Sequence, residues 1–196
     1  MSEDQEFWKK YHLENDAPYL FSDKIKDVTK DLNISSVLEI GCGYGNNLDS
    51  FEGLENVVGI DISEYAIHIA KQRFPQFRFY VGGVLDIPLK EKFDLVFSSA
   101  VIQHVKPHLL DKAFKEIFRV SSRYILNIEA YDDTEHVINW YRGKDESWTI
   151  HVAKRWQKFP VKVLADYDVD DEYRLTLVEK VSDIDHLTFE KLSKTS

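Results

Sequence analysis

Short apolar runs alternate with amphipathic stretches through the first 128 residues of the chain. Apolar runs bounded by turn formers are typical of strands buried on both faces, and they predict strands at 36–40, 57–60, 77–81, 93–98 and 123–128. Strands that alternate with helical stretches are typical of a parallel sheet with helices on both faces. The pattern therefore predicts a three-layer, doubly wound α/β fold.

The stretches between these runs carry apolar residues at helical spacing. Residues 4–32 predict an N-terminal helical region, which the Ala17-Pro18 step divides in two because proline disfavours helix at and before its position. Residues 44–51 predict a short helix, and Ser63 is the expected cap of the next one. The clearest pattern spans 109–120, where the expected core face is Leu110, Ala113, Phe114, Ile117 and Phe118.

The last third of the chain departs from this alternation. Residues 131–160 hold three of the four tryptophans and several cationic groups, and predict an insert. Runs at 162–165 and 173–180, joined by an acidic turn, predict a hairpin that adds an antiparallel edge to a mostly parallel sheet. We expect one domain over 1–181, followed by a frayed tail over 182–196. Its expected parts are N-terminal helices (4–32), a central core (34–130), the insert (131–160) and closing strands (161–181).

Composition restricts the compartment and the partners. The formal net charge of −9 argues against DNA or RNA as a partner, because nucleic-acid binders usually present a basic footprint. Cys42 is the only cysteine, so no disulfide forms within the chain, which fits a reducing compartment. The acidic N-terminus does not resemble a signal peptide, and no stretch is long and apolar enough to span a bilayer. We expect a cytoplasmic monomer or homodimer that has no membrane partner.

A glycine-rich turn follows the first predicted strand. Gly41, Gly43 and Gly45 let the backbone turn sharply and approach a ligand closely, which is typical of a nucleotide site. The dinucleotide fingerprint would need a further glycine where Asn46 stands. The turn therefore indicates a nucleotide other than NAD, although NAD stays open as an alternative.

Two carboxylates narrow the choice of nucleotide. Glu39 lies two residues before the first glycine, where it would repel a pyrophosphate but suit a ligand with an ammonium and a sulfonium. Asp61 ends the second predicted strand, where an acid can accept both ribose hydroxyls. Together they favour S-adenosylmethionine.

The same segments resemble class I S-adenosylmethionine-dependent methyltransferases. Residues 37–45 resemble motif I, 58–63 the segment after it, 80–89 the adenine loop and 93–96 motif IV. The resemblance implies a Rossmann-like cofactor core over 34–130 and S-adenosylhomocysteine as the product. It implies cofactor binding by Glu39, Gly41, Cys42, Gly43, Gly45, Asn46, Asp61, Ile62, Gly83, Val84, Leu85 and Ser98.

Gly83 departs from the family pattern. The family often has an aspartate there that binds the adenine amino group, so the backbone of Val84 is expected to hold the adenine edge instead. Asp86 is either a substitute for that aspartate or a turn former before Pro88.

A narrower resemblance extends beyond the cofactor core. Residues 119–126, 141–143 and 166–167, with the loop residues 46–48, resemble the pseudaminic-acid-biosynthesis-associated methylases. That resemblance implies a sugar or surface-glycan context.

The candidate catalytic residues follow the fourth and fifth predicted strands. Methyl transfer requires an aligned acceptor and, for an oxygen acceptor, removal of a proton. His104 is the leading candidate for the base; alternatively it starts the next helix and packs beneath the cofactor. Glu129 and Tyr131 are further candidates, although Glu129 also fits a solvated charge at a strand end.

The insert supplies the candidate substrate residues. Tyr141 and Arg142 could hold a sugar face and an anionic group, whereas the insert's tryptophans could also form a small core of their own. Trp8 and Tyr11 fit core packing better than closure over the cofactor. The spacing of histidines and acids matches no metal site, so no metal is expected.

These features predict a methyltransferase that acts on a small polar acceptor such as a sugar or nucleotide sugar. Two alternatives remain open: a protein or peptide methyltransferase, and a catalytically silent binding subunit.

Overall fold

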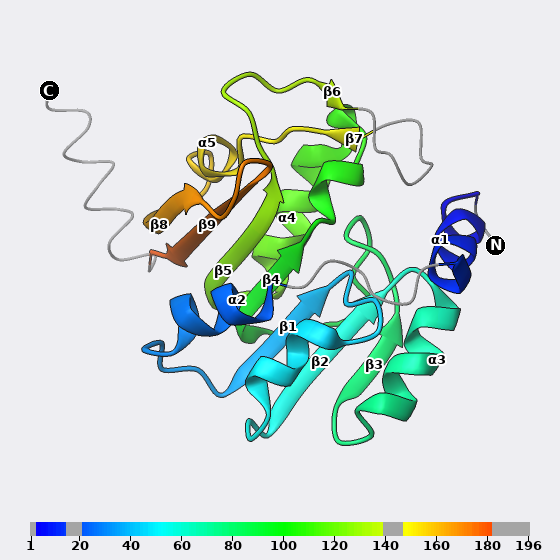
Figure 1. Cartoon of the computed structure of the whole chain (residues 1–196). Helices are drawn as coiled ribbons and strands as arrows, with labels where there is room; N and C mark the ends of the chain where they lie inside the picture. Colours follow the sequence, from blue (N-terminus) through cyan, green and yellow to red (C-terminus); the bar gives the residue numbers. More distant parts are fainter. Residues whose placement is uncertain (1–2, 15–20, 139–146, 182–196) are drawn as a thin grey trace, which may run out of the picture.

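Seven strands form one sheet at the centre of the computed structural model, which describes residues 3–14, 21–138 and 147–181 (Figure 1). The strands are β1 (Ser36–Ile40), β2 (Asn56–Asp61), β3 (Arg78–Val81), β4 (Phe93–Ser99), β5 (Ser121–Ala130), β8 (Val161–Asp168) and β9 (Tyr173–Lys180). Their order across the sheet is β3-β2-β1-β4-β5-β9-β8. The pairs among β1 to β5 are parallel, whereas β9 lies antiparallel to both β5 and β8. The sheet confirms the predicted mostly parallel arrangement with an antiparallel C-terminal hairpin.

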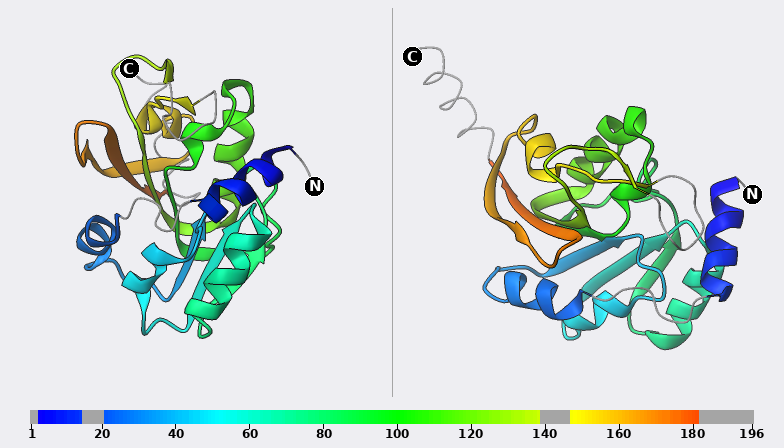
Figure 2. Two further views of the ribbon diagram at one scale, coloured as in Figure 1. Left: turned by 45° about the vertical axis from the view of Figure 1, so that its right-hand side comes forward. Right: turned by 45° about the horizontal axis from the view of Figure 1, so that its top comes forward.

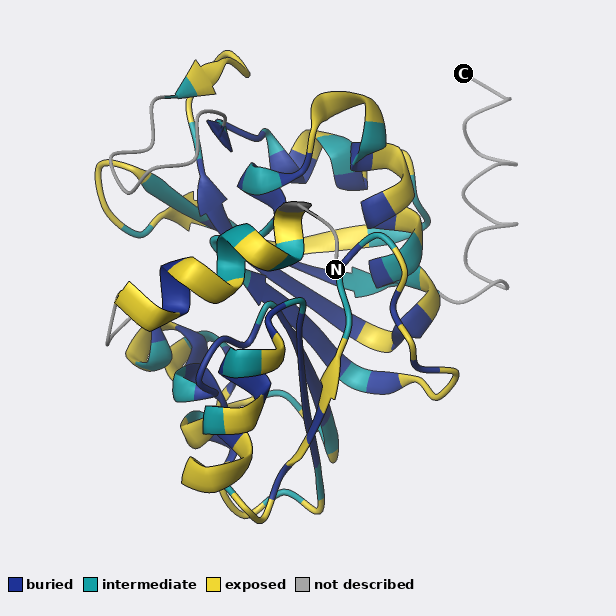
Figure 3. Ribbon diagram, turned by 90° about the vertical axis from the view of Figure 1, so that its right-hand side faces the viewer, coloured by how far each residue is buried: buried dark blue, intermediate teal, exposed yellow. Residues whose placement is uncertain are grey.

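Helices cover both faces of this sheet (Figure 2). One face carries α2 (Ser22–Thr29), the 3-10 helix η1 (Asn46–Phe51) and α3 (Glu64–Arg73), and the other carries α4 (Leu110–Val120) and α5 (Val152–Trp156). Successive side chains of a strand point to opposite faces of the sheet. Val37 of β1 therefore packs in the core beside α2 and α3, and Leu38 packs in the core beside α4 and α5. Figure 3 shows the buried strands between helices whose outer surfaces are exposed. The three-layer fold is therefore confirmed.

The predictions for individual helices were confirmed in part. Ser63 does cap α3, since its hydroxyl accepts a hydrogen bond from Ala66 N at 3.3 Å. The helix expected over 44–51 is wrong in type and start: it is the 3-10 helix η1, which begins after Gly45 in the left-handed conformation. On α4, Phe118 is only partly buried and Val120 lies in the core. The Ala17-Pro18 break and the tail over 182–196 lie outside the described residues.

The described part of the insert does not form a core of its own. It contains the short strands β6 (Val137–Ile138) and β7 (Ser147–Trp148), followed by α5. Trp156 of α5 is fully buried, packs on Phe114 with ring centroids 4.6 Å apart, and donates from Nε1 to Asn127 Oδ1 at 2.8 Å. The insert therefore extends the core on the α4 face of the sheet.

The acidic turn between β8 and β9 is held by local partners. Arg174 pairs with Asp166 at 3.0 Å and with Asp168 at 2.6 Å, while Asp170 accepts from the backbone N–H groups of Glu172 and Tyr173. These contacts agree with a turn rather than a calcium site. Among the described helices, none is long and apolar enough to cross a membrane.

Candidate active site

A cavity of about 730 Å³ lies at the carboxyl ends of β1, β2, β4 and β5. In doubly wound sheets ligands bind at these ends, where the strand order reverses, and here the reversal lies between β1 and β4. The helix α1 (Glu3–Glu14) lines one side of the cavity with Asp4, Trp8, Tyr11 and His12. Two ends can be distinguished: a nucleotide end built from the loops after β1, β2 and β3, and an acceptor end built from α1, η2 (Ile102–His104), the insert and the β8–β9 turn.

The glycine turn is fixed against β2. The backbone N–H groups of Gly41 and Cys42 both donate to Ile60 O, at 2.8 and 2.9 Å. Gly41 has φ +70°, and a Cβ there would lie 2.3 Å from Cγ2 of Val101. Only glycine fits a left-handed position against another side chain, so the turn can follow the cavity wall closely.

Asp61 is buried beside this turn. Its Oδ2 accepts from Gly43 N at 2.9 Å and its Oδ1 from Ser63 N at 2.8 Å. Burial raises the pKa of Asp61, while the nearby His12 and the two backbone N–H groups lower it. A carboxylate oxygen has more than one acceptor site, so both oxygens can still accept from ribose hydroxyls.

Glu39 has an unsatisfied oxygen. Its Oε1 accepts from Asn47 Nδ2 at 2.8 Å, whereas its Oε2 is buried and has no hydrogen-bond partner among the described residues. Burial raises the pKa of Glu39 well above its ordinary value, the Asn47 hydrogen bond lowers it, and Asp61 raises it. A buried acceptor without a partner is costly, and a ligand ammonium would satisfy it. The free acceptor on Glu39 therefore fits the amino-acid end of S-adenosylmethionine.

The loop after β3, where the adenine contact is expected, forms part of the cavity wall. Ile62, Gly83, Val84 and Leu85 all line the cavity. A Cβ at Gly83 would meet only Ile62 Cδ1, at 3.8 Å, so the position is open. Asp86 is exposed and outside the cavity lining, and its N–H donates to Gly83 O at 3.1 Å. Asp86 thus belongs to the turn and not to the cavity wall.

Two predicted cofactor residues lie away from the cavity. Gly45 caps η1 and lies against the rings of Phe74 and Phe79. Ser98 is buried in β4, where its hydroxyl donates to Glu129 Oε1 and accepts from Asn127 Nδ2. The remaining predicted cofactor residues line the cavity: Glu39, Gly41, Cys42, Gly43, Asn46, Asp61, Ile62, Gly83, Val84 and Leu85.

Glu129 is fully buried, so its interpretation as a solvated charge is wrong. It accepts from Ser98 Oγ at 2.8 Å, Val101 N at 3.0 Å and Gln103 N at 3.2 Å. Burial raises its pKa to about 7, against the lowering effect of these hydrogen bonds. Glu129 is absent from the cavity lining, and its contacts instead anchor the loop that carries His104.

His104 and Tyr131 line the acceptor end. His104 Nδ1 lies 2.8 Å from Ser147 Oγ, and its ring meets Trp8 edge-on with centroids 5.0 Å apart. The Tyr131 hydroxyl donates to Asp133, and the Arg174 guanidinium lies over its ring. His104 thus lies in the wall of the cavity.

Several lining residues were not predicted. Trp8 and Tyr11 line the cavity, Tyr11 is also buried as core packing predicts, and His12 lies beside them on α1. The other unpredicted lining residues include Asn47, Gln103, His136, Thr149, Asp171, Glu172 and Tyr173. They come from segments far apart in the chain and belong to no local motif. Tyr141 and Arg142 lie outside the described residues.

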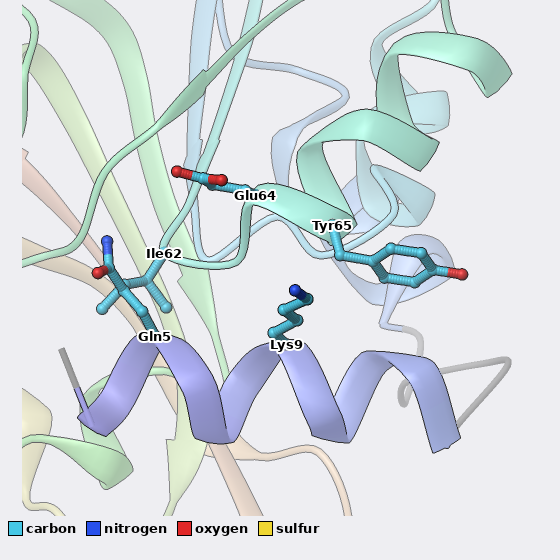
Figure 4. Close-up of a pocket in the computed structure, with 5 residues that line it drawn as sticks. All are labelled: Gln5, Lys9, Ile62, Glu64 and Tyr65. Carbon is cyan, nitrogen blue, oxygen red and sulfur yellow. The ribbon is translucent and has the colours of Figure 1, made fainter. Parts of the chain in front are cut away.

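A smaller cavity of about 240 Å³ separates α1 from α3 (Figure 4). Gln5 and Lys9 of α1 face Ile62, Glu64 and Tyr65 across it. Ile62 lines both cavities, so this gap lies behind one wall of the larger one. Within the described residues, no group of three or more histidines, cysteines and acids could hold a metal ion.

Comparisons with known proteins agree with this geometry. A family model described as a methyltransferase domain matches residues 37–123. A putative methyltransferase of Invertebrate iridescent virus 6 is 27% identical over 190 residues, which cover 91% of this chain and 66% of that protein. A tRNA U34 carboxymethyltransferase of Shewanella frigidimarina is 28% identical over 59% of this chain and 38% of its own length. The chain therefore spans only part of the length of these relatives.

A solved structure adds the fold-level likeness. The 1,6-didemethyltoxoflavin-N1-methyltransferase of Burkholderia thailandensis, with bound 1,6-didemethyltoxoflavin and S-adenosylhomocysteine, has a TM-score of 0.74 and 14% identity. The match covers 90% of this chain and 86% of that one. With the observed sheet order, it shows that the chain has the fold of this methyltransferase, and the family model matches a methyltransferase domain at residues 37–123.

Proposed function

We propose that this chain transfers a methyl group from S-adenosylmethionine to a small polar acceptor. One observation carries the proposal: a single cavity runs from Glu39 and Asp61, which suit the donor, to His104, which suits proton removal. Its volume of about 730 Å³ falls in the range of small-molecule sites. The alternative of a silent binding subunit does not account for a base candidate in the same cavity.

Residues of the nucleotide end would hold the donor. Glu39 Oε2 would accept from the ammonium and Asp61 from the ribose hydroxyls, with adenine against Ile62 and the backbone of Val84. When bound, S-adenosylmethionine supplies a methyl group on a positively charged sulfur, which departs as a neutral thioether.

His104 would act on the acceptor. The acceptor atom's lone pair forms the new bond to the methyl carbon as the carbon–sulfur bond breaks towards sulfur. His104 takes the proton that the acceptor atom loses and becomes an imidazolium. Trp8 and Tyr11, on α1, would limit the access of water to this end.

Charge at the acceptor end favours a neutral or amine-bearing acceptor. The described residues that line this end include the carboxylates of Asp4, Asp132, Asp171 and Glu172, against the single ammonium of Lys106. An acceptor that carries a pyrophosphate would meet unfavourable charge there. The resemblance to pseudaminic-acid-associated methylases supports a sugar, and an amino sugar meets both conditions. A cytoplasmic location, with its reducing environment, fits the single, buried Cys42.

Labelled methyl donor tests the acceptor class. We would offer a neutral sugar, an amino sugar, a nucleotide sugar and a basic peptide at equal concentrations. The proposal predicts labelling of the sugar or amino sugar above the nucleotide sugar. Labelling of the peptide alone would favour the protein methyltransferase, and donor binding without any labelling would favour the silent subunit.

His104→Ala tests whether His104 is the base. It should reduce turnover by roughly 100-fold or more, the usual contribution of a general base, while the donor Kd stays unchanged. Unchanged turnover would remove His104 from the mechanism.

A further inference from the structure

We propose that Ser147 is a positioning residue for His104: its hydroxyl oxygen accepts from Nδ1–H and holds the imidazole in the tautomer whose Nε2 carries the lone pair. The proposal rests on the methyl-transfer function above, because only a base needs that lone pair. Nothing in the sequence links the two residues, which are 43 positions apart.

Ser147 is placed by the insert. It belongs to β7, which pairs with β6 through Ile138, and it is fully buried. Its Oγ lies 2.8 Å from His104 Nδ1, a good hydrogen-bond distance. His104 itself ends η2, whose backbone is anchored by Glu129. Hydroxyl and imidazole therefore meet from two independently supported segments.

Gln103 indicates which ring nitrogen carries the proton. Its Oε1 accepts from Ala130 N at 2.9 Å, which fixes the amide orientation and turns its Nε2 towards His104 Nε2 at 3.5 Å. An amide nitrogen only donates, so a hydrogen bond at this contact requires a lone pair on His104 Nε2. A neutral imidazole then carries its proton on Nδ1, and Ser147 Oγ must accept it.

This tautomer is the one that a base requires. Nε2 can accept the proton of a hydroxyl or amine only if it holds a lone pair, and the contact from Gln103, at the limit of hydrogen-bond length, is weak enough to be replaced. Once Nε2 is protonated, Ser147 Oγ continues to accept from Nδ1–H and stabilises the imidazolium. The edge-on contact with Trp8 restricts ring rotation from the α1 side. Ser147 thus acts through His104 rather than on the acceptor.

Nitrogen-15 NMR of the full-length protein tests the tautomer directly. The protein would be labelled at histidine and measured without ligands near pH 8.5, about two units above the ordinary histidine pKa. The His104 signals are those missing from His104→Ala. We expect the wild type to show the Nδ1–H tautomer, and Ser147→Ala to shift the ring towards a mixture or towards Nε2–H.

Thr149→Val is the control for this measurement. It removes another buried hydroxyl of the same insert, which hydrogen-bonds to Thr134 and His136 rather than to His104. The control should leave the His104 tautomer unchanged. An Nε2–H tautomer in the wild type would overturn the proposal even if Ser147→Ala fails to fold, and so would an unchanged tautomer in folded Ser147→Ala.

Kinetics separate this proposal from the proposed function. Ser147→Ala should lower kcat roughly 10- to 100-fold, the usual cost of losing a supporting hydrogen bond to a catalytic group, and leave the donor Kd unchanged. If the wild type methylates nothing in the acceptor panel, the proposed function fails while the NMR result still decides the role of Ser147. If the wild type is active and Ser147→Ala keeps full kcat, only the positioning role is lost.

Discussion

The two ends of the cavity are built in different ways. The nucleotide end comes from three short loops after neighbouring strands, and its carboxylates Glu39 and Asp61 are held by groups of the same loops. The acceptor end joins α1, η2, the insert and the β8–β9 turn. Because the nucleotide end is built from neighbouring loops, its geometry is fixed locally. The acceptor end is built from distant segments, so its preference for an acceptor can change without altering the nucleotide end.

Removing the Asp61 carboxylate should have the largest effect on the nucleotide end. Asp61→Ala loses the ribose acceptor and also leaves Gly43 N and Ser63 N without their partner. We expect the donor Kd to rise at least 100-fold, about 3 kcal/mol, in titration calorimetry.

Asp94→Ala is the matched control. Asp94 also accepts backbone N–H groups, from Ser35 and Ser36, but it lies outside the cavity lining. It should lower stability and leave the donor Kd unchanged. Equal losses of affinity in both variants would mean that Asp61 acts only by holding the fold.

Glu129, which anchors the loop that carries His104, should make the free energy of unfolding depend on pH. The folded pKa of Glu129, about 7, lies above its ordinary value of 4.5, so the folded state binds more protons between these values. Its contribution to the free energy of unfolding therefore falls as pH rises from about 4.5 to about 7, by roughly 3 kcal/mol in total, and levels off above.

Glu129→Gln should remove that part of the pH dependence in denaturant unfolding. The amide can keep an oxygen towards the backbone N–H groups and donate to Ser98 Oγ, so the variant is expected to fold. Glu179→Gln neutralises a surface carboxylate paired with Arg123 and should leave the dependence in place. A Glu129→Gln profile parallel to the wild type would contradict the assignment.

Glu39 should give a smaller change in donor affinity. Glu39→Gln loses the charged acceptor for the ammonium, and we expect the Kd to rise roughly 10- to 30-fold, about 1.5 to 2 kcal/mol. Because the pKa of Glu39 is raised, the wild-type affinity should weaken as pH falls and the carboxylate gains a proton. Calorimetry across pH should find this dependence reduced in the variant; a dependence equal to that of the wild type would exclude Glu39 as its source.

Gly83 should give the smallest effect, and in the opposite direction. The position is open, so Gly83→Asp can introduce the adenine contact of the family pattern and lower the donor Kd roughly three- to tenfold, about 0.7 to 1.4 kcal/mol. Gly83→Ala, which adds no acceptor, should leave the Kd unchanged. A weaker Kd for Gly83→Asp would show that adenine lies elsewhere.

The same contrast explains what the sequence could predict. The strands and the glycine turn follow from local patterns, and β1 begins and ends at the predicted residues 36 and 40. Asp61 and Glu39 line the cavity, and their sequence positions predicted this because the strands that carry them also fix their places relative to the glycines. Gly45 lies in the glycine turn and Ser98 lies just after residues 93–96, yet the surroundings of the two residues depend on Phe74 and on Glu129, which belong to other segments.

The residues that come together at the acceptor end could not be predicted from local sequence patterns. Trp8 lies almost a hundred residues from His104 in sequence, and only the fold brings the two rings together. Glu129 was predicted either to touch the acceptor or to be a solvated charge, but one donor from β4 and two from the loop after it make its burial tolerable. Contacts between distant segments of this kind leave no periodic or spacing signal.

Titration calorimetry of the wild-type chain with S-adenosylmethionine, S-adenosylhomocysteine and NAD tests the central claim most directly. An ammonium-accepting Glu39 and a ribose-accepting Asp61 predict saturable binding of the first two ligands and none of NAD. Binding of NAD alone, or of none of the three, would contradict the assignment of this cavity to methyl transfer.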